Sequence, residues 1–263
     1  RLVSVLDKEF SQNLKMNFKK KGVDVVLKAN VTAIEEAEEG VRVIYESSGK
    51  QESVCAQGVL VSVGRKPQTA GLFAEGSTPE MNRGFITVNE RYESSIPGIY
   101  AIGDVIGGVQ LAHKAEAEGL ACVAYLEGKE PDTSVHVVPS CIYSSPEIAS
   151  VGMTADEAKV KGIEVKKSKY LMSGNGKSMI EGEDRGFIKM VFDAETERIL
   201  GVQMMCGRAT DLISEFTGAI VNGLTLKQLL AGMRPHPSFC EGITEALEAV
   251  HGMSIHSAPV KRP

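Results

Sequence analysis

The spacing of apolar residues predicts one helix and several strands in the first 70 residues. Phe10, Leu14 and Phe18 recur every four residues, which predicts an amphipathic helix over residues 7–21, and Gly22 marks its end. Strands are then predicted at residues 23–29, in a pair over 32–46 joined at Glu39-Gly40, and at 58–64. The last of these runs is apolar on both faces, as buried parallel strands are. This order predicts the second half of a Rossmann-like, nucleotide-binding α/β domain.

A loop-rich segment, residues 65–84, separates this part from the next. Short strands are predicted at residues 85–90 and 98–104, followed by a helix over 112–128. The strand at Ile99–Ile102 is apolar and ends in Gly103-Asp104. A carboxylate just beyond the carboxyl end of a strand lies where open α/β sheets bind ligands, but a simple Gly-Asp turn fits equally well.

The pattern changes near Val135 and predicts an α+β domain with an antiparallel sheet. Thr154 is predicted to cap a helix, with Glu157 completing a capping box. Ser238 and Glu241 have the same spacing before a final apolar helix. The predicted strands lie at 141–145, 165–170, 187–193 and 199–206, with a hairpin turn in 192–199 and helices near 154–161, 209–222 and 225–231.

Composition and charge argue against several classes of protein. Apolar residues make up 43% of the chain, charged residues 24%, and the net charge is −5. We see no basic stripe with aromatic residues, which argues against nucleic-acid binding, and no apolar run long enough for a membrane helix. The scattered thiols form no C-x-x-C or similar motif, so we expect neither a metal site nor a local dithiol, and we expect a reducing cytoplasm. The five cysteines are Cys55, Cys122, Cys141, Cys206 and Cys240.

The stretch "RPHPSFCEG" contains the strongest candidate for catalysis. His236 precedes the predicted cap of the last helix, and Glu241 follows five residues later. By local rules alone His236 is either an ordinary residue before a helix or a base with Glu241 as its partner.

Three stretches in sequence order resemble the flavin-dependent pyridine-nucleotide disulfide oxidoreductases. "SSIPGIYAIGDV" resembles the second flavin motif of that family, and "QLAHKAEAEG" the helix after it. The resemblance implies that Gly103 and Asp104 bind the ribityl chain of FAD. It places Ala112 and His113 at a helix N-terminus near the flavin ring, with the backbone at Ala112 favoured over the His113 side chain.

The nicotinamide nucleotide site is implied by a weaker likeness. "LVSVGRKP" resembles the family's strand that ends the NAD domain, so Gly64 would allow the backbone to approach NAD closely. Val31 corresponds to a position near the adenine end, although an ordinary strand residue fits Val31 better.

The third stretch, "HPSFCE", matches the family's His-Pro-Thr/Ser-x-x-Glu signature. The resemblance implies that His236 is a base, that Glu241 orients it, and that His236 acts on the disulfide of the opposite subunit in a homodimer. The tail "ALEAVHGMSIH" is similar to the dihydrolipoamide dehydrogenase branch. That branch implies oxidation of a lipoyl-bearing protein of a 2-oxoacid dehydrogenase or glycine cleavage complex, with FAD and NAD.

The resemblance also implies the domain organisation. We predict a partial NAD-binding domain at 1–70, a partial FAD-binding segment at 71–134 and an interface domain at 135–263. The family's dithiol and both pyrophosphate loops would precede Arg1, so we expect the chain to be part of a longer enzyme and inactive alone. Two alternatives stay open: a non-catalytic dimerisation module, and a reductase of a small disulfide such as glutathione.

Overall fold

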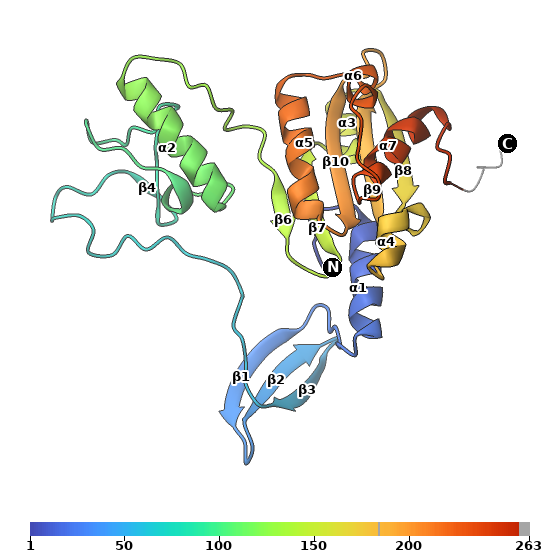
Figure 1. Cartoon of the computed structure of the whole chain (residues 1–263). Helices are drawn as coiled ribbons and strands as arrows, with labels where there is room; N and C mark the ends of the chain where they lie inside the picture. Colours follow the sequence, from blue (N-terminus) through green and yellow to red (C-terminus); the bar gives the residue numbers. More distant parts are fainter. Residues whose placement is uncertain (184, 258–263) are drawn as a thin grey trace. The chain divides into compact units, whose positions relative to one another are not determined.

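The computed structural model describes residues 1–183 and 185–257 and divides into two compact units (Figure 1). One unit consists of Arg1–Val61 together with the chain from Pro139 onward, and the other of Ser62–Val138. The three-part division of the chain predicted from sequence stays a prediction.

The centre of the first unit is a five-stranded antiparallel sheet, which confirms the predicted α+β part. Its predicted hairpin turn is also present, because Oδ1 of Asp193 accepts a hydrogen bond from the Thr196 amide at 2.7 Å. The strand β7 was not predicted. In spatial order the strands are β6 (Ser140–Ile142), β7 (Glu147–Gly152), β10 (Ile199–Cys206), β9 (Phe187–Asp193) and β8 (Val165–Leu171).

Helices pack on this sheet through alternating side chains. The helix α1 (Lys8–Lys20) has the predicted boundaries, and its Phe10 lies against Phe187, with ring centres 4.5 Å apart. Ile188, the next residue of β9, points to the opposite face, where α7 packs. The remaining helices of this unit are α3 (Ala155–Val160), α4 (Gly176–Ile180), α5 (Ala209–Val221), α6 (Leu226–Leu230) and α7 (Glu241–Glu248).

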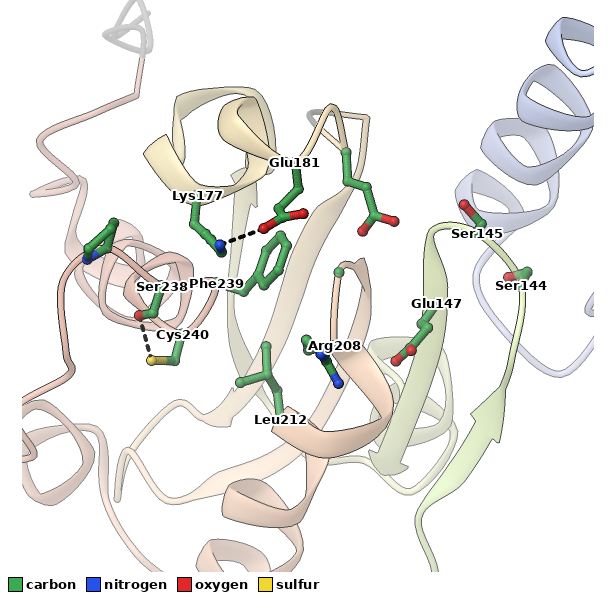
Figure 2. Close-up of a pocket in the computed structure, with 13 residues that line it drawn as sticks. Ser144, Ser145, Glu147, Lys177, Glu181, Arg208, Leu212, Ser238, Phe239 and Cys240 are labelled. Carbon is green, nitrogen blue, oxygen red and sulfur yellow. Dashed lines mark hydrogen bonds and ion pairs between the residues drawn. The ribbon is translucent and has the colours of Figure 1, made fainter.

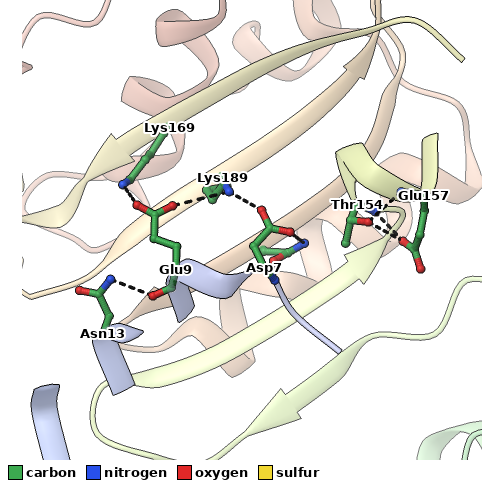
Figure 3. Close-up of polar contacts among 8 residues, drawn as sticks. Asp7, Glu9, Asn13, Thr154, Glu157, Lys169 and Lys189 are labelled. Atoms are coloured by element: carbon green, nitrogen blue, oxygen red, sulfur yellow. Dashed lines mark hydrogen bonds and ion pairs between the residues drawn. The ribbon is translucent and has the colours of Figure 1, made fainter. Parts of the chain in front are cut away.

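Polar contacts fix the start of α1 on the sheet (Figure 3). Lys189 pairs with Asp7, and Lys169 pairs with Glu9. The Asp7 amide also donates to Oε1 of Gln203 at 3.1 Å. This seam joins residues near the N-terminus to strands nearly 200 residues later.

The region between α1 and residue 61 differs from the prediction. The predicted antiparallel pair is present as β1 (Asn30–Glu36) and β2 (Val41–Ser47), and an unpredicted β3 (Lys50–Ala56) extends it. The strands predicted at 23–29 and 58–64 were wrong, because neither segment pairs with a strand in the described residues. A parallel strand needs neighbours for its backbone groups, and without them Leu60 and Val63 are 91% and 92% exposed.

The second unit holds the predicted helix as α2 (Ala112–Leu126) and little regular sheet. The predicted strand at 85–90 shortens to β5 (Phe85–Ile86), which pairs with β4 (Met81–Asn82). The strand predicted at 98–104 was wrong: Tyr100 forms only a single bridge, and the 3₁₀ helix η1 (Gly103–Ile106) follows.

Packing of the second unit depends on a small cluster. Tyr92, Ala121 and Cys122 are buried together and hold η1 near α2. In the described part of the chain, no helix combines the length and hydrophobicity needed to cross a bilayer.

Candidate active site

His236 and Glu241 form a direct side-chain pair. Nδ1 of His236 lies 2.8 Å from Oε1 of Glu241, although the two residues belong to a loop and to the first turn of α7. The His236 side chain is 78% exposed and that of Glu241 31%, so the imidazole faces outward while the carboxylate is held by the protein. The structure thus brings the two residues together, and the roles predicted for them stay predictions.

The capping box predicted at Ser238 is only half formed. The Ser238 amide donates to Oε2 of Glu241 at 2.9 Å, but the Ser238 hydroxyl donates to the Pro235 carbonyl instead of capping the helix. The helix begins at Glu241, with Cys240 at the N-cap. The prediction failed because the hydroxyl found a closer acceptor in the preceding loop.

The ionisation of Glu241 reflects competing effects. Partial burial disfavours the charged carboxylate, but hydrogen bonds from the Ser238 amide and the His236 ring outweigh it, so the pKa of Glu241 is lowered. Glu241 is therefore an anion at neutral pH. An anion at Nδ1 fixes the imidazole tautomer that leaves Nε2 free to accept a proton.

The His236 loop is anchored by Arg234, a residue that sequence reasoning missed. Its guanidinium side chain is 6% exposed and pairs with Glu215 of α5 at 2.5 Å. The same group donates to the Thr244 hydroxyl of α7 at 3.2 Å. A charged residue two positions before His236 was the available signal, but only the fold shows that it joins two helices.

Two hollows lie beside the segment 236–241. His236 and Glu241 line a cavity of about 530 Å³. The next residues, Ser238 to Cys240, line another of about 560 Å³ with Lys177 and Arg208 (Figure 2). Of these two cavities, the first is lined by the His236–Glu241 pair and the second is not.

The predicted flavin residues lie together in the second unit. Gly103 has a left-handed φ of +70°, and an added Cβ would lie 2.9 Å from Cβ of Ala115 on α2. The Gly103 amide donates to Oε2 of Glu118 at 2.7 Å. Glu118 is buried and also pairs with Lys114, four residues earlier. Sequence reasoning missed this pair, although its i, i+4 spacing was visible.

Asp104 and the start of α2 complete this arrangement. The Asp104 carboxylate is 38% exposed and pairs with Arg65 at 2.9 Å. Ala112 and His113 form the first turn of α2.

The two residues predicted to approach NAD lie in different units. Gly64 has a φ of +121°, a conformation that favours glycine. Val31 lies in β1 and is 55% exposed. Their roles stay predictions.

Two family models match the chain. Residues 1–119 match the pyridine nucleotide-disulphide oxidoreductase model, and residues 138–247 match the dimerisation domain of the same family. The chain belongs to this family. The match fits the antiparallel sheet and the His236–Glu241 pair described above.

Individual members of the pyridine nucleotide-disulphide oxidoreductase family are similar over nearly the whole chain. Dihydrolipoyl dehydrogenase of Thermus scotoductus is 40% identical over 253 residues, which cover 95% of this chain and 55% of the relative. The Bacillus subtilis enzyme of that name is 39% identical, with 97% and 55% covered. The chain thus spans about half the length of these curated relatives.

A solved structure has the same fold. The HOCl-induced flavoprotein disulfide reductase RclA from Escherichia coli superposes with a TM-score of 0.85 at 25% identity, covering 94% of this chain and 57% of RclA. The family's mixed fold, with its antiparallel dimerisation domain, is therefore confirmed.

Proposed function

We propose that this chain is the C-terminal part of a dihydrolipoyl dehydrogenase. In the longer protein, dihydrolipoamide and NAD⁺ give lipoamide, NADH and a proton. The observation that carries this proposal is the 2.8 Å contact between His236 and Glu241 in a chain whose relatives include dihydrolipoyl dehydrogenases.

His236 performs the proton transfer. A dihydrolipoyl thiol donates its proton to Nε2 of His236, and the resulting thiolate attacks a disulfide supplied by the longer protein, since the thiolate is the nucleophile in such exchanges. The attack forms a mixed disulfide with one sulfur and releases the other as a thiolate; the second lipoyl thiol then displaces the first sulfur, which leaves lipoamide and a reduced dithiol. Glu241 stabilises the imidazolium that forms, because its charge lies at Nδ1. A base positioned in this way contributes about 10²–10⁴ in rate.

The second unit would contribute to binding FAD. Its residues fit the group: the partly exposed Asp104 carboxylate can accept hydrogen bonds from hydroxyl groups, and the positive end of the α2 dipole lies at Ala112, where it favours an anionic group. Glu118 holds Gly103 and thereby the position of Asp104. When bound, FAD would supply electron transfer between the dithiol and NAD.

The remaining predictions belong to the same proposal. We propose NAD contacts near Gly64 and Val31, the three domains 1–70, 71–134 and 135–263, and a homodimer formed through the last. The lipoyl-bearing partner would belong to a 2-oxoacid dehydrogenase or glycine cleavage complex. A cytoplasmic location is also proposed.

Steady-state kinetics of the intact protein test the reaction. We expect NAD⁺-dependent oxidation of dihydrolipoamide, and His236→Gln should lower kcat by about 10²–10⁴ without lowering flavin content. His251→Gln is the matched control, because His251 also pairs with a glutamate, Glu197 at 3.2 Å, away from this cavity. Reduction of glutathione disulfide in place of lipoamide chemistry, or full activity in His236→Gln, would contradict the proposal.

A further inference from the structure

A second histidine–glutamate pair lies one helical turn from the first. Nδ1 of His256 lies 2.7 Å from Oε1 of Glu245. The other oxygen, Oε2, accepts the His256 amide at 3.0 Å and the Ser254 hydroxyl at 2.5 Å. The Glu245 side chain is only 10% exposed, so one buried carboxylate binds three donors from residues 254–256.

These contacts hold residues 254–256 against α7, and His256 lines the same cavity as His236. Gly174 leaves room for this segment, because a Cβ there would lie 2.5 Å from the His256 carbonyl and 2.7 Å from the Tyr170 hydroxyl. Both pairs line the 530 Å³ cavity. The titratable or charged residues that line it are Tyr170, Arg234, His236, Glu241, Glu245 and His256.

The charges of the two pairs act on one another across this cavity. Burial raises the pKa of Tyr170 to about 12, and the carboxylates of Glu245 and Glu241 both add to the effect. The charge of His256 also contributes to the lowered pKa of Glu241, after the contributions of burial, Ser238 and His236. Arg234, the remaining cation, is already paired with Glu215.

We propose that Glu245 and His256 form a second positioning pair, which holds His256 in the wall of the cavity and balances charge beside His236 and Glu241. The inference deepens the proposed function, because it assigns positioning residues to the same site. His256 touches neither reacting atoms nor cofactor in this role; it acts through Glu241 and His236.

The proposal predicts opposite effects of two single variants on the protonation of His236. Glu245→Gln removes a negative charge and should make the His236 imidazole harder to protonate. His256→Gln removes the ring whose positive charge, when it is protonated, offsets Glu245, and should make the His236 imidazole easier to protonate. If the pair only anchored the chain end, both variants would loosen the same segment and change His236 in the same direction.

Chemical modification can measure this in the intact protein. The rate at which diethyl pyrocarbonate modifies His236, followed by peptide mass spectrometry as a function of pH, reports the protonation midpoint of its ring. We expect a midpoint lower by about 0.3–1 pH unit in Glu245→Gln and higher by a similar amount in His256→Gln. His251→Gln should leave the midpoint unchanged, since His251 does not line the cavity.

Each outcome decides the proposal. Opposite shifts support it, and shifts of the same sign or no shift in either variant overturn it. Failure of the proposed function is a separate result, because wild-type protein that does not oxidise dihydrolipoamide still reports the titration of His236. If the wild type is active, the pH profile of kcat/KM should move with the modification midpoint in both variants.

Discussion

The carboxylate of Glu241 binds His236 through one oxygen, at 2.8 Å, and the Ser238 amide through the other, at 2.9 Å. The hydrogen bond from the Ser238 amide fixes the Glu241 carboxylate, and the carboxylate in turn fixes the imidazole ring of His236. The first residue of α7 thus orients the His236 ring, and the complete capping box predicted from sequence does not form.

Glu241→Gln should lower kcat for dihydrolipoamide less than loss of His236 does, by about 10–10². The variant keeps the base but has one acceptor oxygen where two are used, so the ring loses its fixed orientation or Ser238 loses its partner. Kinetics and melting temperature should be measured together. A loss as large as that of His236→Gln, at unchanged melting temperature, would contradict an orienting role.

Arg234→Ala should lower the free energy of unfolding by about 1–3 kcal/mol. Its guanidinium is nearly buried, whereas Glu215 is 39% exposed, so the loss is smaller than for a fully buried pair. Arg208→Ala is the control, because its pair with Asp211 spans 3.6 Å with both side chains over 70% exposed (72% and 73%) and is worth about 0–1 kcal/mol. Urea unfolding of both variants measures the difference; equal losses would refute the anchoring role.

Some elements that depend on local contacts were predicted correctly from the sequence, whereas an element that needs distant strands was predicted wrongly. The helix α1 and the pair β1–β2 follow local periodicity and appeared as predicted. Residues 58–64 also have a clear pattern, but a parallel strand needs neighbours, and the described residues supply none. The apolar pattern of residues 58–64 shows that this segment is suited to a buried strand, but it does not show whether neighbouring strands are present.

In the candidate site, too, a contact between residues close in sequence was predicted and contacts between distant residues were not. The resemblance of "HPSFCE" to the family signature predicted the pairing of His236 with Glu241, which the local sequence rules alone left open. The roles of Arg234 and Glu245 could not be predicted, because their partners lie 19 and 11 residues away and meet only after α5, α7 and the end of the chain have packed.

Acid should release the segment held by Glu245. Although burial opposes its charge, hydrogen bonds from Ser254 and His256 lower the pKa of Glu245 from its ordinary value of 4.5. A lowered folded-state pKa contributes stability above the ordinary value, and this is lost as pH falls through the folded-state value. Hydrogen exchange should show protection of the His256 amide at about pH 6 and its loss at a pH below the lowered pKa of Glu245. Equal protection factors at both would contradict the prediction.

Gly103→Ala should lower the flavin content of the intact protein, and Gly98→Ala should not. Both glycines have left-handed φ, +70° and +79°, so either substitution costs about 1–2 kcal/mol of backbone strain. Only at Gly103 does the new Cβ meet a neighbour, Ala115 at 2.9 Å, whereas no atom lies within 4 Å at Gly98. Separating η1 from α2 would displace the Gly103 amide from Glu118 and move Asp104 with it.

A compensating variant distinguishes this displacement from general destabilisation. Ala115→Gly removes the methyl group that Gly103→Ala would strike, at a helix cost of about 1 kcal/mol. The double variant is therefore less stable in its helix than Gly103→Ala, yet it should bind more flavin. Flavin absorbance per protein, with melting temperature as the second measurement, checks this. If flavin content follows melting temperature across all the variants, including Gly98→Ala, the contact between Gly103 and Ala115 has no specific role in the site.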